Sequence, residues 1–185
     1  ALRRALVVAP KKVAEATWSN ETAKWDHLSD LRVSVVLGSA ARREAALAAE
    51  ADVYVINRDN VAWLVDYYSD PHHKERTWPF DCVVLDESSS FKNHQALRFK
   101  KLKVMRPRIR RMIELTGTPT PHGLTDLWSQ IYLLDGGKRL GRTVSVYRDM
   151  FFLPDKRNGA TVWSYKPREG AQEAIYGLLS DICIS

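Results

Sequence analysis

The chain has 185 residues, of which 45% are hydrophobic and 27% are charged. This length suits one α/β domain, and the hydrophobic content excludes a disordered protein. No apolar run approaches the roughly 20 residues of a membrane helix, and the N-terminus lacks a signal-peptide cleavage site, so no membrane partner is expected. The net charge of +6 is compatible with a polyanionic partner.

Five short apolar runs recur along the chain, each of four or five residues and most of them rich in β-branched side chains. Such runs are typical of buried parallel strands. The predicted strands are Ala5–Ala9, Val33–Leu37, Val53–Ile56, Cys82–Leu85 and Met112–Leu115.

Helical patterns separate these runs, at Lys11–Leu28, Ala40–Ala49, Asp59–Tyr68 and Gln95–Met105. Asn57 or Asp59 is a candidate N-cap for the third helix. The alternation of strands and helices indicates βαβ units, and therefore an α/β fold in which a parallel sheet carries helices on both faces.

The pattern changes after Thr120. Helices are predicted at Leu124–Leu134, Thr143–Phe152 and Ala171–Asp181. A turn is predicted at Pro154–Gly159 and a strand at Thr161–Tyr165. The two cysteines, Cys82 and Cys183, lack metal-ligand spacing, which favours a reducing, intracellular setting.

Ligands of parallel α/β sheets bind at the carboxyl ends of the strands. The strongest motif lies at such an end, in VVLDESSSFKN (residues 83–93), where Asp86 and Glu87 directly follow a strand. The first carboxylate can hold Mg²⁺ and the second can deprotonate an attacking water, as phosphoryl transfer requires. An acidic turn after a strand is the simpler alternative.

A second motif, LTGTPTP (residues 115–121), also follows a predicted strand. Two threonine hydroxyls around a glycine, followed by proline, make a short loop with hydrogen-bonding groups. Asp86 and Thr116 are separated by a single basic helix, so they are expected at adjacent positions on one sheet.

In this order and spacing, the segments APKKV, VYVINRDNV, VVLDESSSFKN and LTGTPTPHGLTDLWSQIYLLDGG resemble the first RecA-like lobe of superfamily-two helicases. Within that superfamily they are most similar to the Swi/Snf-type group, and DESSS with LLDGGKRLG is most similar to phage or prophage members. The resemblance implies an ATP-dependent DNA helicase or translocase that acts on duplex DNA with ATP and Mg²⁺. It also implies a cytoplasmic location in a bacterial or phage-infected cell.

The resemblance assigns roles where residues match. Asp86 would hold Mg²⁺ and Glu87 would be the general base, so that both contact the nucleotide. A coupling loop would link the nucleotide to DNA, and two further loops would contact the DNA backbone. The coupling loop is Thr116, Gly117, Thr118 and Pro119, and the DNA-contacting residues are Pro10, Lys11, Lys12, Asn57 and Arg58.

Two departures from the family pattern matter. Ser89 stands where many relatives have histidine, and no GxxxxGK[ST] phosphate-binding loop occurs. The resemblance therefore implies an incomplete P-loop NTPase lobe over residues 1–135, followed by an extension over 136–185 that leads towards an absent second RecA-like lobe. The chain by itself is expected not to hydrolyse ATP, because that loop binds the β- and γ-phosphates.

Two other functional classes stay open: an α/β nucleic-acid-binding domain without catalysis, and a metal-dependent nuclease. Two basic regions also have alternative interpretations. The eight lysines and arginines between Arg98 and Arg111 are either a solvated surface or a phosphate-tracking patch. Trp163 and Tyr165, near Lys156, Arg157 and Lys166, are a candidate nucleic-acid contact.

Overall fold

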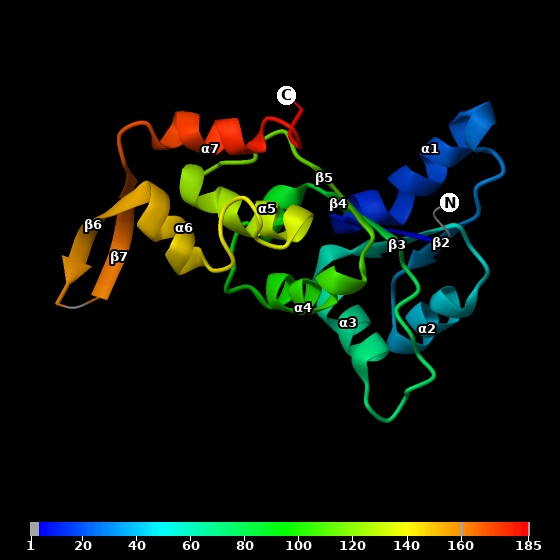
Figure 1. Cartoon of the computed structure of the whole chain (residues 1–185). Coiled ribbons are helices and arrows are strands. Elements are labelled where there is room, and N and C mark those ends of the chain that lie inside the picture. Colours follow the sequence, from blue (N-terminus) through cyan, green and yellow to red (C-terminus); the bar gives the residue numbers. More distant parts are fainter. Residues whose placement is uncertain (1–3, 160, 185) are drawn as a thin grey trace.

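The computed structural model describes residues 4–159 and 161–184 (Figure 1). Five strands form one parallel sheet in the order β2-β3-β1-β4-β5. All five predicted strands are confirmed to within one residue at each end. They are β1 (Ala5–Ala9), β2 (Val33–Val36), β3 (Val53–Asn57), β4 (Cys82–Asp86) and β5 (Arg111–Leu115).

Helices cover both faces of this sheet, as the alternating pattern predicted. The larger apolar core packs α2 (Ala40–Ala48), α3 (Val61–Ser69), α4 (Leu97–Met105) and α5 (Leu127–Asp135) on one face. A smaller core on the other face joins β1 and β3 to the segment that leads into α1 (Trp18–Lys24). The predicted α/β fold class is confirmed.

The first helical region differs from the continuous helix predicted over Lys11–Leu28. It consists of a π-helix at Val13–Thr17, then α1, then a 3₁₀ turn at Asp26–Leu28. The π-helical turn immediately precedes Trp18 and therefore changes the direction in which the following side chains project. Apolar periodicity does not report this change, because the hydrogen-bonding pattern depends on tertiary contacts.

The predicted N-cap of the third helix is wrong. A 3₁₀ turn at Arg58–Asn60 leads into α3, and neither turn nor helix has a side-chain cap. The Asn57 side chain instead accepts a hydrogen bond from Asn60 Nδ2 at 2.5 Å, and Asn60 Oδ1 accepts one from Arg43 Nη1 at 2.6 Å. The amide groups thus bind one another rather than the helix terminus.

The C-terminal part contains α6 (Val144–Phe151) and α7 (Ala171–Leu179), with a two-stranded antiparallel hairpin between them. The turn predicted at Pro154–Gly159 is wrong, because β6 spans Phe152–Asn158 and pairs with β7 (Thr161–Pro167). Pro154 is tolerated within a strand because the register shifts next to it and the hairpin has two free edges. That this segment is a strand is evident only from its pairing with β7.

The predicted division at residue 135 stays a prediction. Buried side chains on both sides of it belong to one core, for example Leu102 before it and Tyr147 and Ile175 after it. Figure 1 shows the hairpin beyond α5 and α6, at the end of the molecule opposite α1. In the described part of the chain, no helix is long and apolar enough to span a membrane.

Candidate active site

Asp86 and Glu87 lie at the carboxyl end of β4, where the sequence placed them. Glu87 has φ 59° and ψ 61°, the left-handed conformation, and is the single described non-glycine residue with positive φ. Such a conformation costs a bulky side chain on the order of 1–3 kcal/mol and persists where surrounding contacts hold it. This backbone conformation turns the chain sharply from the strand into the serine-rich 3₁₀ turn.

Two hydroxyl groups hold the Glu87 side chain. Ser89 Oγ donates a hydrogen bond to Glu87 Oε1 at 2.6 Å, and Thr116 Oγ1 donates to the same oxygen at 3.1 Å. Among the described residues, Oε2 accepts no side-chain hydrogen bond. The carboxylate therefore has a defined orientation and one oxygen available to a further donor, such as a water molecule.

Asp86 is held by a side chain from the face of the sheet that carries the smaller core. Trp18 Nε1 donates to Asp86 Oδ2 at 3.2 Å, across 68 residues of sequence. The aspartate is half-buried, and its second oxygen has no hydrogen bond within the described residues. An anionic oxygen with this freedom fits Mg²⁺, which binds through one or two carboxylates and keeps water and phosphate ligands. Trp18 was not predicted as a site residue, because 68 residues of sequence separate it from Asp86.

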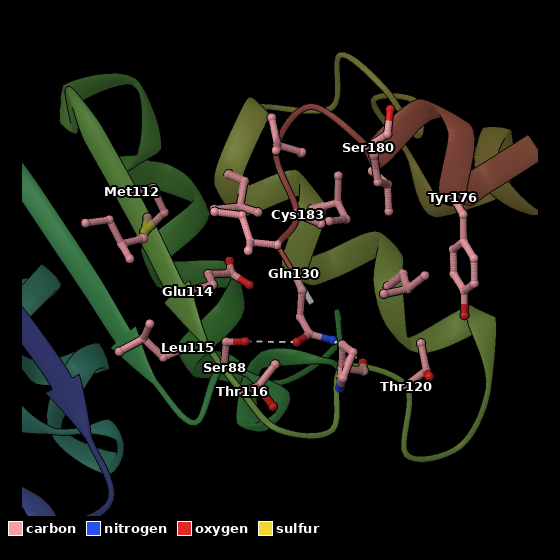
Figure 2. A pocket seen from close by; sticks show the side chains of 18 residues that line it. Ser88, Met112, Glu114, Leu115, Thr116, Thr120, Gln130, Tyr176, Ser180 and Cys183 are labelled. Atoms are coloured by element: carbon pink, nitrogen blue, oxygen red, sulfur yellow. Dashed lines mark hydrogen bonds between the residues drawn. The ribbon is translucent and has the colours of Figure 1, made fainter.

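The loop after β5 is held by a hydrogen bond within the loop and by a hydrogen bond from a side chain on α5. Thr116 Oγ1, which binds Glu87, also accepts a hydrogen bond from Thr118 N at 3.1 Å. Gln130 donates to the Pro119 and Asp126 carbonyls and accepts from Ser88 Oγ at 3.0 Å, as Figure 2 shows for the last bond. The two motifs predicted to be adjacent are thus connected through side chains. Gln130 was not predicted, because its partners lie in three separate segments.

A second link joins the Lys-Asn end of the first motif to the helix after the second. Lys92 Nζ lies 4.0 Å from Asp126 Oδ2, and Ser129 Oγ donates to the Lys92 carbonyl. Asp126 Oδ2 also accepts from His122 N at 2.9 Å. These contacts connect the segment after Glu87 to the start of α5.

The five predicted DNA-contacting residues lie at the ends of β1 and β3, which are neighbours in the sheet. Lys11 and Lys12 are exposed, and Lys11 Nζ is 3.8 Å from Glu15 Oε1. Arg58 is half-buried, whereas Asn57 is only 7% exposed. Lys11 and Lys12 thus present cations at this edge, whereas the buried Asn57 is the last residue of β3.

Several cations of the basic stretch from Arg98 to Arg111 have partners within the chain. Arg98 lies 3.6 Å from Asp59, and Lys101 pairs with Asp66. Lys103 Nζ lies 4.4 Å from the centre of the Tyr132 ring, and Arg106 donates to the carbonyls of Ile109 and Leu134. Half of the eight cations therefore have structural partners, which favours the surface interpretation over a phosphate-tracking patch.

An apolar cavity of about 810 Å³ opens along β5 and is bordered by five successive residues, Met112 to Thr116 (Figure 2). Glu114 projects towards α5 and α7 there, and its Oε1 is buried without a hydrogen-bond partner. Burial raises the pKa of Glu114 well above its usual range, and the neighbouring Ser88 hydroxyl opposes that rise. β5 pairs only with β4 in the described sheet, so its other edge is free.

The protein is an α/β protein with a RecA-like parallel sheet, and it carries a carboxylate pair at the end of β4. The chain matches the SNF2-related domain model over residues 2–176, and it belongs to that family. The resemblance stated from the sequence is thereby confirmed.

Its relatives include a phage protein and eukaryotic helicases. The chain is 38% identical, over 97% of its length, to "Putative protein p41" of Acyrthosiphon pisum secondary endosymbiont phage 1. It is 28% identical, over 78% of its length, to Helicase swr1 of Aspergillus fumigatus. The fold is similar to that of a Sulfolobus solfataricus SWI2/SNF2 ATPase core in complex with dsDNA, with a TM-score of 0.69, 24% identity and 99% of this chain covered.

The chain corresponds to a limited part of each of these proteins. It spans 39% of the phage protein, 8% of the fungal helicase and 33% of the archaeal core.

Proposed function

We propose that this chain supplies the hydrolytic part of an ATP-dependent DNA translocase located in the cytoplasm of a bacterial or phage-infected cell. The observation that carries the proposal is the Glu87 carboxylate, held in a left-handed turn by Ser89 and Thr116. A carboxylate with one bound and one available oxygen suits a general base that orients the attacking water.

Asp86 is assigned to Mg²⁺ bound with ATP. The ion would neutralise phosphate charge, which is the chemistry that it supplies in phosphoryl transfer. The Trp18 indole keeps Asp86 Oδ2 in place and leaves the other oxygen for coordination. Glu87 then receives the proton of the attacking water through Oε2.

The loop Thr116–Pro119 is assigned to coupling between nucleotide and DNA. Thr116 contacts Glu87 directly, and the same loop is bound to α5 through Gln130. The loop would thereby link the γ-phosphate site to α5. Pro10, Lys11, Lys12, Asn57 and Arg58 lie at the ends of β1 and β3 in the same sheet. These residues are assigned to the DNA backbone, for which lysines and free amides at a helix start are suited.

The phosphate-binding loop and the second lobe are assigned to the rest of the protein. The free edge of β5 is the proposed position of the remaining strand, because a parallel strand added there would end beside Thr116. A hydrogen-bond donor on that strand, or on the helix after it, would satisfy the orphaned oxygen of Glu114. The chain alone is expected to show no measurable ATP turnover.

The decisive test is DNA-stimulated ATP hydrolysis by the complete protein with Glu87→Gln. General base catalysis contributes about 10²- to 10⁴-fold, so the variant is expected to lose at least about a hundredfold in kcat. Glu173→Gln, an exposed carboxylate on α7, is the matched control and should behave as the unaltered protein.

The same assay distinguishes the non-catalytic alternative. A complete protein that binds DNA but never hydrolyses ATP would support a nucleic-acid-binding domain instead. Turnover by the isolated chain, abolished by Glu87→Gln, would refute the expectation that the chain is inactive alone.

A further inference from the structure

The β6–β7 hairpin is a separate, cation-rich feature of the surface. Residues 152–168 contain four lysines and arginines and one aspartate. Beyond Phe152, every described residue of β6 is exposed. Trp163, on β7, is 63% exposed, an unusual state for the largest apolar ring in proteins. The hairpin therefore presents charge and an aromatic surface together.

The base of the hairpin is anchored. Phe152 is buried, and Tyr165 packs against the core with the Arg148 guanidinium 4.6 Å from its ring centre. Arg168 donates its backbone N–H to the Phe151 carbonyl at 2.9 Å and a side-chain N–H to the Asp149 carbonyl at 3.2 Å. These contacts fix where the hairpin leaves the lobe, so its outer part is held in a defined place.

The outer cations of the hairpin are not neutralised by carboxylates within the described residues. Within residues 4–159 and 161–184, Lys156, Arg157 and Lys166 make no ion pair and no side-chain hydrogen bond. Lys156 Nζ lies 5.4 Å from the centre of the Trp163 ring, which orders the ammonium without neutralising it. The single carboxylate, Asp155, accepts a hydrogen bond from Ser164 at 3.0 Å.

We propose that the β6–β7 hairpin is a second DNA-binding element, in which Lys156, Arg157 and Lys166 contact the phosphates of duplex DNA beside the ordered Trp163 ring. Uncompensated cations complement a phosphate backbone, and a two-stranded ribbon has the width of the major groove. The element lies beyond α5 and α6, at the end of the molecule opposite α1 (Figure 1). It therefore extends the footprint and is independent of the assigned rim contacts, although it rests on the proposed DNA partner.

The test measures the binding of a short fluorescent duplex of mixed sequence to the complete protein between about 50 and about 200 mM salt. The triple variant K156A/R157A/K166A is expected to lose on the order of tenfold in affinity. The dependence of log K on log salt should become shallower by about one for each cation that contacts a phosphate. Trp163→Ala is expected to lose about two- to fivefold, the value of an exposed cation–π contact.

Three controls keep the result interpretable. K24A/K74A/K138A removes the same charge from exposed positions elsewhere and should leave the affinity and the salt dependence unchanged. Trp25→Ala removes a tryptophan that is 55% exposed on the opposite side of the lobe. K156R/R157K/K166R keeps the charge and should bind like the unaltered protein. Circular dichroism confirms that each variant is folded.

A rim variant, Lys12→Ala with Arg58→Ala, separates this inference from the proposed function. If the rim variant weakens binding and the hairpin variant does not, the hairpin inference is wrong and the proposed function stands. If the hairpin triple loses no more than its control triple, or loses affinity for single-stranded DNA only, the inference is also overturned. A loss specific to the hairpin, on duplex DNA, supports it whichever way the rim variant behaves.

Discussion

Two basic regions of this molecule differ in how their cations are bound within the chain. Between Arg98 and Arg111, half of the cations bind carboxylates, aromatic rings or backbone carbonyls of the same chain. On the β6–β7 hairpin, Lys156, Arg157 and Lys166 have no carboxylate or carbonyl acceptor among the described residues, although Lys156 Nζ lies 5.4 Å from the centre of the Trp163 ring. The comparison teaches that the density of charge along a sequence is a poor guide to a polyanion-binding surface. The supply of internal acceptors distinguishes the two regions.

The largest effect on stability is expected at Arg106, whose guanidinium joins α4 to the end of α5. Arg106→Ala leaves the carbonyls of Ile109 and Leu134 without these donors, so the free energy of unfolding should fall by about 2 kcal/mol. DNA affinity at matched folded concentration should not change. Urea denaturation measures the first quantity, with the exposed neighbour Arg108→Ala as control. A loss of DNA binding in a fully folded variant would contradict the assignment of Arg106 to contacts within the chain.

Glu114 has a buried carboxylate oxygen without a hydrogen-bond partner among the described residues. Its raised pKa means that the folded state holds the proton more tightly than the unfolded state, so stability falls as pH rises above about 4.5. Glu114→Gln should remove this loss. Its advantage over the unaltered chain should grow by about 1.4 kcal/mol per pH unit until the raised pKa is passed. Urea denaturation of both chains across pH checks this; parallel profiles would contradict it.

Ser89 is expected to matter through the position of Glu87. Ser89→Ala removes a charge-assisted hydrogen bond, and kcat of the complete protein should fall by on the order of tenfold while KM for ATP changes little. Ser89→Thr retains the hydroxyl and should restore most of the rate. Ser90→Ala is the matched control, because the buried Ser90 Oγ has no partner. An equal loss in the Ser90 variant would show a general effect of the turn instead.

The smallest effect is expected at Lys101, whose ammonium pairs with Asp66 at a partly exposed position. Lys101→Ala should change the free energy of unfolding by less than about 1 kcal/mol, and a double-mutant cycle with Asp66→Ala should give a coupling of similar size. Its DNA affinity should match that of the unaltered protein. A hairpin-like change in salt dependence would instead make the 98–111 stretch a phosphate contact.

The strands and the residues that directly follow them could be predicted, because both depend on residue types that are close together in the sequence. The five strands follow from short β-branched runs, and Asp86, Glu87 and Thr116 follow from being placed directly after two of them. The roles assigned to these residues stay predictions. The cap at Asn57 and the turn at Pro154–Gly159 failed, because each depended on a partner in another segment: Asn60 with Arg43, and strand β7.

Sequence alone therefore determined the class of fold, the family and the order of the polar motifs along the rim. Those properties depend on side-chain periodicity and on which residues end each strand. Tertiary structure decided which polar groups are satisfied: that Trp18 holds Asp86, and that two hydroxyls hold Glu87. It also decided that Arg98, Lys101 and Arg106 have acceptors within the chain, whereas Arg157 and Lys166 have none among the described residues. A hydrogen bond or ion pair needs two groups within a few ångströms, and only the folded chain brings residues from distant segments that close.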